Sequence, residues 1–175
     1  MSVVWKCRGM IALAAAAALL AGCASPGPVV LIDVPFMEQP PNRCGAASLE
    51  MVAQYLGAEV DRAVLDHEIY IPALAGTVPE LMAEGARKQG LSASVEKGTK
   101  TDLQRLLQDG TPPILMLSST DDNSKGHFVV VTGLNLQTGA LRVHSGRDRN
   151  RWLSHTSWYP RWVRADCCMV VVRRP

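Results

Sequence analysis

A cysteine stands where a helix is expected to begin, and this arrangement limits the fold more than any other feature of the sequence. Cys44 opens a run with apolar residues at helical spacing that ends at Gly57. Backbone N–H groups at a helix N-terminus favour negative charge, so they favour a thiolate over a thiol. The upstream Gln39 carries a side-chain amide that suits a developing oxyanion. The stretch therefore predicts a nucleophilic cysteine at the start of a helix.

A histidine far downstream supplies the base that such a cysteine needs. His127 follows Gly126 and begins the apolar run Phe128 to Val131, which is typical of a buried strand. A thiolate is activated by an adjacent imidazole, and the two residues need to be close only in the fold. The alternative is that both are structural, because an isolated buried cysteine is usually an inert apolar residue. Their occurrence together with Gln39 favours a cysteine hydrolase.

The N-terminus is typical of a targeting segment. Lys6 and Arg8 precede an apolar, alanine-rich run from Met10 to Leu20, which is too short to span a bilayer. Leu20-Ala21-Gly22-Cys23 resembles a bacterial lipobox, which implies cleavage before Cys23 and lipid attachment to it. An ordinary signal peptide is the alternative. No aspartate follows Cys23, which for lipoproteins implies the outer membrane, with the domain facing the periplasm.

We therefore expect three parts: a lipoprotein signal peptide (1–22), a lipidated tether (23–32) and one domain (33–175). Lys6 and Arg8 leave with the signal, so the mature chain has 16 basic and 16 acidic residues. A formally neutral chain gives no reason to expect a nucleic-acid partner. Membrane contact is expected through the lipid alone.

Three cysteines would remain unmodified after processing, and only Cys44 is expected to react. Neighbouring cysteines form a disulfide only with strain, so Cys167 and Cys168 are predicted to stay free. Cys168 begins the run to Val172 and is expected to pack in a strand. No CxxC or HxxxH spacing suggests a metal site, and we expect no cofactor.

The predicted elements give the class α+β, because helices come first and a mostly antiparallel sheet follows. Thr77-Val78-Pro79-Glu80 resembles a capping box for a helix that ends at Gln89. Trp152, Trp158 and Trp162 are expected to pack against the last strand, with a partner-binding surface as the alternative. A further short helix is predicted at 101–108, and strands are predicted at 91–95, 114–117, 127–132 and 141–144.

A cysteine on an early helix and a histidine on a late strand is the papain-like order of parts. Within that group, Gln39 and Cys44-Gly45-Ala46-Ala47 resemble the motif of the double-glycine leader peptidases, which process bacteriocins, and of their stand-alone lipoprotein relatives. Gly126 to Gly133 is similar to the histidine strand of that family. The resemblance covers roughly 33–175 and implies a papain-like fold with the cysteine helix packed on the sheet.

The sequence departs from the family at the third catalytic position. The family usually carries an aspartate one strand beyond the histidine, and strand alternation puts Ser145 there. A serine can hold a histidine N–H but brings no negative charge to an imidazolium. His144 and Asp148 are the neighbours that remain as alternatives for orienting His127.

The resemblance implies acyl transfer, with His127 holding Cys44 as thiolate and with Gln39 and the Cys44 N–H stabilising the oxyanion. It also implies a peptide or protein substrate, and envelope or secretion proteins as partners. One rival is a cell-wall endopeptidase of the NlpC type, in which His144 would be the third residue, although Arg43-Cys44-Gly45-Ala46 does not fit its Asp-Cys-Ser-Gly-like motif. Another is an envelope assembly lipoprotein that binds peptides without cleaving them.

Overall fold

The computed structural model describes residues 28–119 and 126–175. An antiparallel sheet forms its middle layer, in the order β2-β7-β3-β4-β5-β6, and a short strand β1 also pairs with β4. The strands are β1 (Val29–Leu31), β2 (Ser92–Lys97), β3 (Ile114–Leu117), β4 (His127–Asn135), β5 (Leu141–Ser145), β6 (Asp148–Leu153) and β7 (Cys168–Arg173). The class α+β is confirmed.

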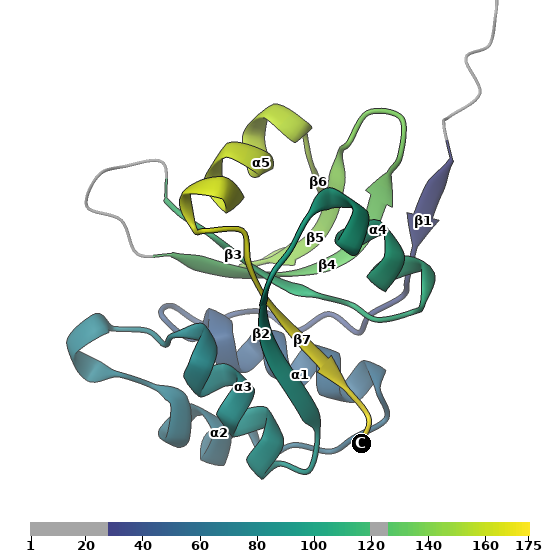
Figure 1. Cartoon of the computed structure of the whole chain (residues 1–175). Coiled ribbons are helices and arrows are strands. Elements are labelled where there is room, and N and C mark those ends of the chain that lie inside the picture. The colour runs from purple at the N-terminus through teal and green to yellow at the C-terminus, as the bar shows by residue number, and fades with distance from the viewer. Residues whose placement is uncertain (1–27, 120–125) are drawn as a thin grey trace, which may run out of the picture.

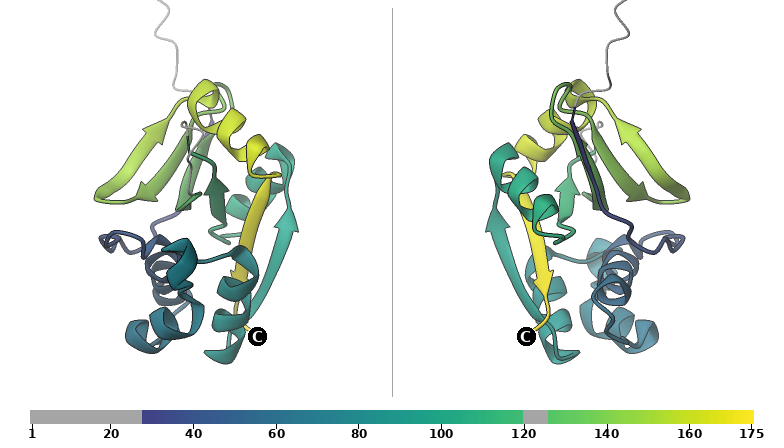
Figure 2. Two further views of the ribbon diagram at one scale, coloured as in Figure 1. Left: turned by 90° about the vertical axis from the view of Figure 1, so that its left-hand side faces the viewer. Right: turned by 90° about the vertical axis from the view of Figure 1, so that its right-hand side faces the viewer.

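Helices cover both faces of this sheet (Figure 1). The helices are α1 (Cys44–Tyr55), α2 (Arg62–Ile69), α3 (Pro79–Lys88), α4 (Lys100–Gln108) and α5 (His155–Arg164), with a 3₁₀ turn η1 (Pro72–Leu74) before α3. Helices α1, α2 and α3 gather at one end of the molecule and cover one face of the sheet, while α4 and α5 cover the opposite face (Figures 1 and 2). None of the helices in the described ranges is long and apolar enough to cross a membrane.

Alternate residues of the central strands belong to two separate cores. Phe128 and Val130 pack with α1–α3, whereas Val129 and Val131 pack with α4 and α5. Side chains of a strand point alternately to its two faces, so an unbroken apolar run is the pattern of a strand buried on both sides. The run that begins after His127 therefore fixes β4 in the middle of the molecule.

The tryptophan-rich segment folds differently from the expectation in one respect. Trp158 and Trp162 are fully buried, and Trp162 donates its indole N–H to the carbonyl of Cys168 at the start of β7 (2.9 Å). Trp152 is 46 % exposed on β6, so the prediction that it packs against the last strand is wrong. The two buried residues are four apart on α5, which places them on one helix face.

Two local expectations also need correction. Helix α3 begins at Pro79 with Val78 as its N-cap, and Thr77 makes no capping bond, so the predicted capping box is absent there. A proline at the first helical position has no N–H to satisfy, which lessens the need for a side-chain cap. Strand β1 pairs with Gly133–Asn135 of β4, so the folded domain takes in part of the range 23–32 expected as a tether. Cys23 lies outside the described residues.

Candidate active site

Cys44 is the first residue of α1, as its sequence context predicts. Asn42 takes a left-handed conformation (φ 63°), and the N–H of Arg43 donates to the carbonyl of Pro40 (3.0 Å), which turns the chain into the helix. The first N–H groups of a helix have no intrahelical acceptor. Here Ala47 is the first to bond back, to the carbonyl of Arg43 (3.1 Å), so the N–H groups of Cys44 and Gly45 precede the helical ladder.

Gln39 is buried beside Cys44 and its amide is held at both ends. Its Nε2 donates to Ser48 Oγ (3.0 Å) and to the carbonyl of Phe128 (3.2 Å), while its Oε1 accepts from the N–H of Gly146 (2.6 Å). A flipped amide would face donor with donor at Gly146 and acceptor with acceptor at Phe128, so its orientation is set by the backbone. Gln39 thus joins α1, β4 and the β5–β6 turn.

His127 and Ser145 meet at the start of β4 and the end of β5. The imidazole Nε2 lies 2.9 Å from Ser145 Oγ. Ser145 therefore occupies the position next to the histidine that strand alternation predicts. With Nε2 engaged, Nδ1 is the ring nitrogen that is left for the thiol, and the Nε2–H tautomer would give it a free lone pair.

The two alternatives to Ser145 are used elsewhere. His144 is fully buried, with Nε2 2.9 Å from the carbonyl of Val34 and Nδ1 accepting from the N–H of Asn150 (3.1 Å). Asp148 pairs with Arg151 on the exposed strand β6 (2.7 Å). His144 therefore holds strands together, and neither residue is seen to contact His127.

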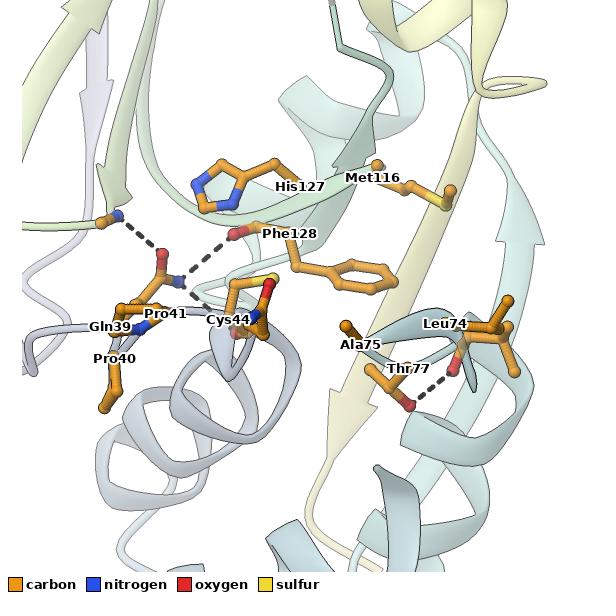
Figure 3. A pocket seen from close by; sticks show the side chains of 15 residues that line it. Gln39, Pro40, Pro41, Cys44, Leu74, Ala75, Thr77, Met116, His127 and Phe128 are labelled. Carbon is orange, nitrogen blue, oxygen red and sulfur yellow. Dashed lines mark hydrogen bonds between the residues drawn. The ribbon is translucent and has the colours of Figure 1, made fainter. Parts of the chain in front are cut away.

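Cys44, His127 and Gln39 line the same cavity of about 550 Å³. Figure 3 shows these three residues on one side of the cavity and Leu74 and Ala75 on the other. Volumes of this size are typical of pockets that bind small molecules or peptide side chains. The fold therefore brings to one cavity three residues that the sequence pattern predicts to share a site.

The opposite wall was not foreseen from the sequence. It comes from the turn η1, where Leu74 is 51 % exposed and Ala75 adopts a left-handed conformation (φ 43°). Ile71 and Gly76 close this loop with a backbone hydrogen bond of 2.7 Å from the Ile71 N–H to the Gly76 carbonyl. A left-handed alanine is strained and such strain clusters at functional sites, but an alanine carries no sequence signal for it.

The electrostatics favour a neutral pair, contrary to the expectation of a resting thiolate. Burial raises the pKa of the Cys44 thiol, and the backbone groups of Phe128 and Gly45 only partly oppose it. Burial lowers the pKa of His127, and the positive charge of Arg161 lowers it further. The N-terminus of α1 thus does not outweigh burial, and Ser145 adds no negative charge.

The other free cysteines are not set up for reaction. Cys167 and Cys168 are both free thiols in the structure, and Cys168 begins β7. Burial and the charges of Glu80 and Asp166 raise the pKa of Cys168 to about 11, which leaves little thiolate at neutral pH. Within the ranges 28–119 and 126–175, His, Cys, Asp and Glu residues nowhere gather in a group suited to a metal ion.

Solved structures with the same fold extend over most of the chain. A C39-like peptidase from Bacillus anthracis is 16 % identical with a TM-score of 0.68, covering 85 % of this chain and 98 % of its own. A double glycine motif protease from an AMS/PCAT transporter, in complex with the leader peptide, is 18 % identical with a TM-score of 0.62 and covers 83 % and 94 %.

The peptidase domain of Streptococcus ComA, a bifunctional ABC transporter of a quorum-sensing pathway, is 18 % identical with a TM-score of 0.61 and covers 81 % and 98 %. Among curated proteins, none matches this sequence. The model of the peptidase C39 family matches residues 34–162, a range that contains Cys44, His127 and Ser145. The chain therefore belongs to the peptidase C39 family of cysteine peptidases.

Proposed function

We propose that this protein hydrolyses peptide bonds with Cys44 as nucleophile and His127 as general acid and base. The observation that carries the proposal is the meeting of Cys44, His127 and Gln39 on one cavity, with Ser145 2.9 Å from the far ring nitrogen of His127. A nucleophile, its base and a group that orients the base are the parts that covalent acyl transfer requires.

Each step moves one proton through His127. Nδ1 takes the proton of the Cys44 thiol while Sγ attacks the peptide carbonyl and forms a tetrahedral oxyanion. Collapse of that intermediate breaks the C–N bond, and His127 returns the proton to the leaving amine. Water then attacks the thioester while His127 takes a proton from it, and collapse of the second tetrahedral intermediate breaks the C–S bond, releases the carboxyl product and returns the proton from His127 to Cys44 Sγ.

The oxyanion would be stabilised by the N–H groups at the start of α1 and by Gln39. The Gln39 Nε2 already donates to Ser48 Oγ and the Phe128 carbonyl, so it has to redirect one hydrogen toward the oxyanion. Removal of one such donor typically costs about 3 kcal/mol of transition-state stabilisation.

Because Cys44 and His127 are both neutral before the reaction, His127 would act as a base while Cys44 attacks the carbonyl. Burial raises the thiol pKa of Cys44 and lowers that of the imidazole, so proton transfer would accompany formation of the C–S bond. A general base works best when its pKa lies near the operating pH, and a His127 below its ordinary value still accepts a proton at neutral pH. Slow turnover follows, because a thiol reacts more slowly than a thiolate.

The substrate is proposed to be a peptide or an unfolded protein segment in the bacterial envelope. One solved structure of the same fold holds a leader peptide, which supports a peptide as the ligand. The lipobox-like Leu20-Ala21-Gly22-Cys23 supports anchoring of the domain through lipidated Cys23, in the outer membrane facing the periplasm. Envelope or secretion proteins would then be its partners.

The test compares cleavage of a fluorescence-quenched peptide library by the full chain and by Cys44→Ala. Loss of all turnover in Cys44→Ala with an unchanged circular dichroism spectrum is expected. Cys168→Ser is the matched control, because it removes a thiol of raised pKa outside the cavity. Full activity in Cys44→Ala would overturn the proposal. Peptide binding without cleavage by the wild-type chain would favour the binding-module alternative.

A further inference from the structure

Positive charge is concentrated in the last part of the chain. From Arg142 onward there are eight arginines and two aspartates. The expected mature chain is formally neutral, so the part before Arg142 is acidic by the same amount. In the fold these arginines are spread apart: Arg174 donates to the carbonyl of Leu56 at the end of α1, whereas Arg161 and Arg164 lie on α5.

Two of these arginines are docked on the strand end beside His127. Arg161 donates from Nε to the carbonyl of Ser118 (2.8 Å), and Arg164 donates from Nε to Ser118 Oγ (3.1 Å). Ser118 directly follows Leu117, which is the residue of β3 paired with His127 of β4. The guanidinium of Arg161 therefore sits one residue from the cross-strand neighbour of the histidine.

The histidine and helix α5 also share one face of the sheet. Val129 and Val131 pack with Trp158 and Trp162 of α5. His127 lies two residues before Val129, so strand alternation directs its side chain to the same face. This placement agrees with the charge of Arg161 lowering the pKa of His127.

Arg151, Arg161 and Arg164 lie close enough to repel one another, and the described residues around Arg161 and Arg164 supply no carboxylate to balance their charge. The charges of Arg164 and Arg151 lower the pKa of Arg161, after burial. Arg151 pairs with Asp148 (2.7 Å), whereas the structure gives Arg161 and Arg164 only neutral oxygen acceptors within the ranges it describes. Guanidinium groups held in place by carbonyl groups, with N–H groups to spare, are suited to bidentate binding of a carboxylate.

We propose that Arg161 and Arg164, with Arg151 beside them, form a carboxylate-binding subsite next to His127 that takes an acidic side chain of the peptide substrate. The proposal rests on the peptidase function proposed above. It also gives the acidic residue a second effect. A bound carboxylate offsets the charge of Arg161 and supplies negative charge on the histidine side of the site, where Ser145 has none. Acidic substrates would therefore make His127 a stronger base.

The subsite is tested without relying on turnover, by the alkylation of Cys44 with iodoacetate and with iodoacetamide. The two reagents have the same leaving group and nearly the same size, and only iodoacetate carries a carboxylate. Mass spectrometry of the Cys44 peptide from the full chain gives both rate constants. We expect their ratio, normalised to that of free cysteine, to be about tenfold higher in the protein, as one charge-assisted contact allows.

Arg161→Gln and Arg164→Gln should each lower that ratio severalfold and leave the iodoacetamide rate no slower. Arg105→Gln is the matched control: Arg105 is exposed on α4 and pairs with Asp102 (3.1 Å). An unchanged ratio in Arg161→Gln would overturn the subsite. Asp121 and Asp122 are the other source of a carboxylate close in sequence. If the ratio of the iodoacetate rate to the iodoacetamide rate rises only when Asp121 and Asp122 are both replaced by asparagine, the arginines bind these two aspartates. That outcome would overturn the proposal that they bind the substrate.

Peptides identical except for glutamate or glutamine near the scissile bond complete the test. The wild-type chain should cleave the glutamate peptide with the higher kcat/KM, and Arg161→Gln should remove the difference. If neither peptide is cut by the wild-type chain, the peptidase function fails, while the alkylation ratio still decides the subsite. Equal cleavage of both peptides would overturn the preference for acidic substrates.

Discussion

The cysteine side and the histidine side of the site differ in how their polar groups are satisfied. On the cysteine side, Gln39 is buried and hydrogen-bonded to Ser48, Phe128 and Gly146. On the histidine side, within the ranges that the structure describes, His127 is hydrogen-bonded to the neutral side chain of Ser145 and lies near the positive charge of Arg161. Several hydrogen bonds fix Gln39 on the cysteine side. On the histidine side, Ser145 supplies no negative charge to offset the positive charge of Arg161. The two sides of the cavity thus differ in their electrostatics as well as in their hydrogen bonding.

Apart from removal of the nucleophile itself, the largest effect is expected on the cysteine side, from Gln39→Ala. The change removes the proposed oxyanion donor and leaves buried partners unpaired at Ser48, Phe128 and Gly146. We expect kcat/KM to fall by about 10²–10³ and the free energy of unfolding to fall by about 1–3 kcal/mol. Peptide cleavage and urea denaturation measure the two.

Gln39→Glu separates the two contributions. A glutamate keeps the acceptor for the Gly146 N–H but has no Nε2 donor. The Gln39→Glu variant should therefore lose as much activity as Gln39→Ala, while its free energy of unfolding should change by a different amount. If Gln39→Ala kept wild-type turnover, Gln39 would be only a structural link between α1, β4 and the β5–β6 turn.

The histidine side should gain activity when the missing charge is supplied, in Ser145→Asp. A carboxylate beside Nε2 stabilises the imidazolium and raises the pKa of His127, which favours the thiolate form of Cys44. We expect the alkylation of Cys44 by iodoacetamide at pH 7 to become about tenfold faster, since one pKa unit is worth about 1.4 kcal/mol.

Ser145→Asn is the control for size, because it fills the same space without charge. A Ser145→Asp protein that reacts no faster than Ser145→Asn would mean that the neutral residue does not limit the pair. The difference in charge between the cysteine side and the histidine side would then have no effect on the reactivity of Cys44.

Much of this contrast was accessible from the sequence, because it depends on local patterns. The Cys44 helix and the His127 strand follow from apolar periodicity, and Ser145 next to His127 follows from strand alternation. Strand β6 was missed because Asp148–Leu153 carries charges on an exposed edge in place of alternating apolar residues. Helix α5 was not predicted, since Pro160 interrupts its pattern.

Other features depend on tertiary contacts that no local pattern contains. Thr99 and Asp102 form the capping box of α4, whereas the same kind of motif at Thr77 makes none. The placement of Arg161 beside His127 joins α5 to the end of β3 through Ser118, which is 43 residues away in sequence. The neutral state of Cys44 depends on how deeply the folded chain buries it.

The acidic limb of the pH dependence of kcat/KM is expected to follow the protonation of His127, the proposed base. Burial and Arg161 lower its pKa, so the imidazole stays unprotonated to a lower pH than a free histidine, whose pKa is about 6.5. The acidic limb of kcat/KM should therefore have its midpoint below 6.5, and Arg161→Gln should move it upward. A midpoint above 6.5 in the wild-type chain would mean that an anion near His127 offsets both effects.

The smallest effect separates His144 from its neighbour Ser145. His144 donates from Nε2 to Val34 and accepts at Nδ1 from the Asn150 N–H, which requires the neutral ring. Protonation at Nδ1 would set two donors face to face, and burial lowers the pKa of His144 accordingly. The unfolded chain then binds a proton more readily, so the free energy of unfolding falls as the pH drops through and below about 6.5.

We expect the lost Asn150 hydrogen bond to account for about 1 kcal/mol of this decrease. His144→Gln removes the titrating ring and should reduce the pH dependence, as measured by urea denaturation between neutral and mildly acidic pH. His67→Gln, at an exposed position on α2, is the control for the loss of a histidine. A wild-type slope in His144→Gln would contradict the assignment. Because the ring nitrogens of His144 are bonded to Val34 and Asn150, its substitution should change stability before it changes alkylation of Cys44. That result would separate a structural residue of β5 from its neighbour Ser145, which is proposed to position His127.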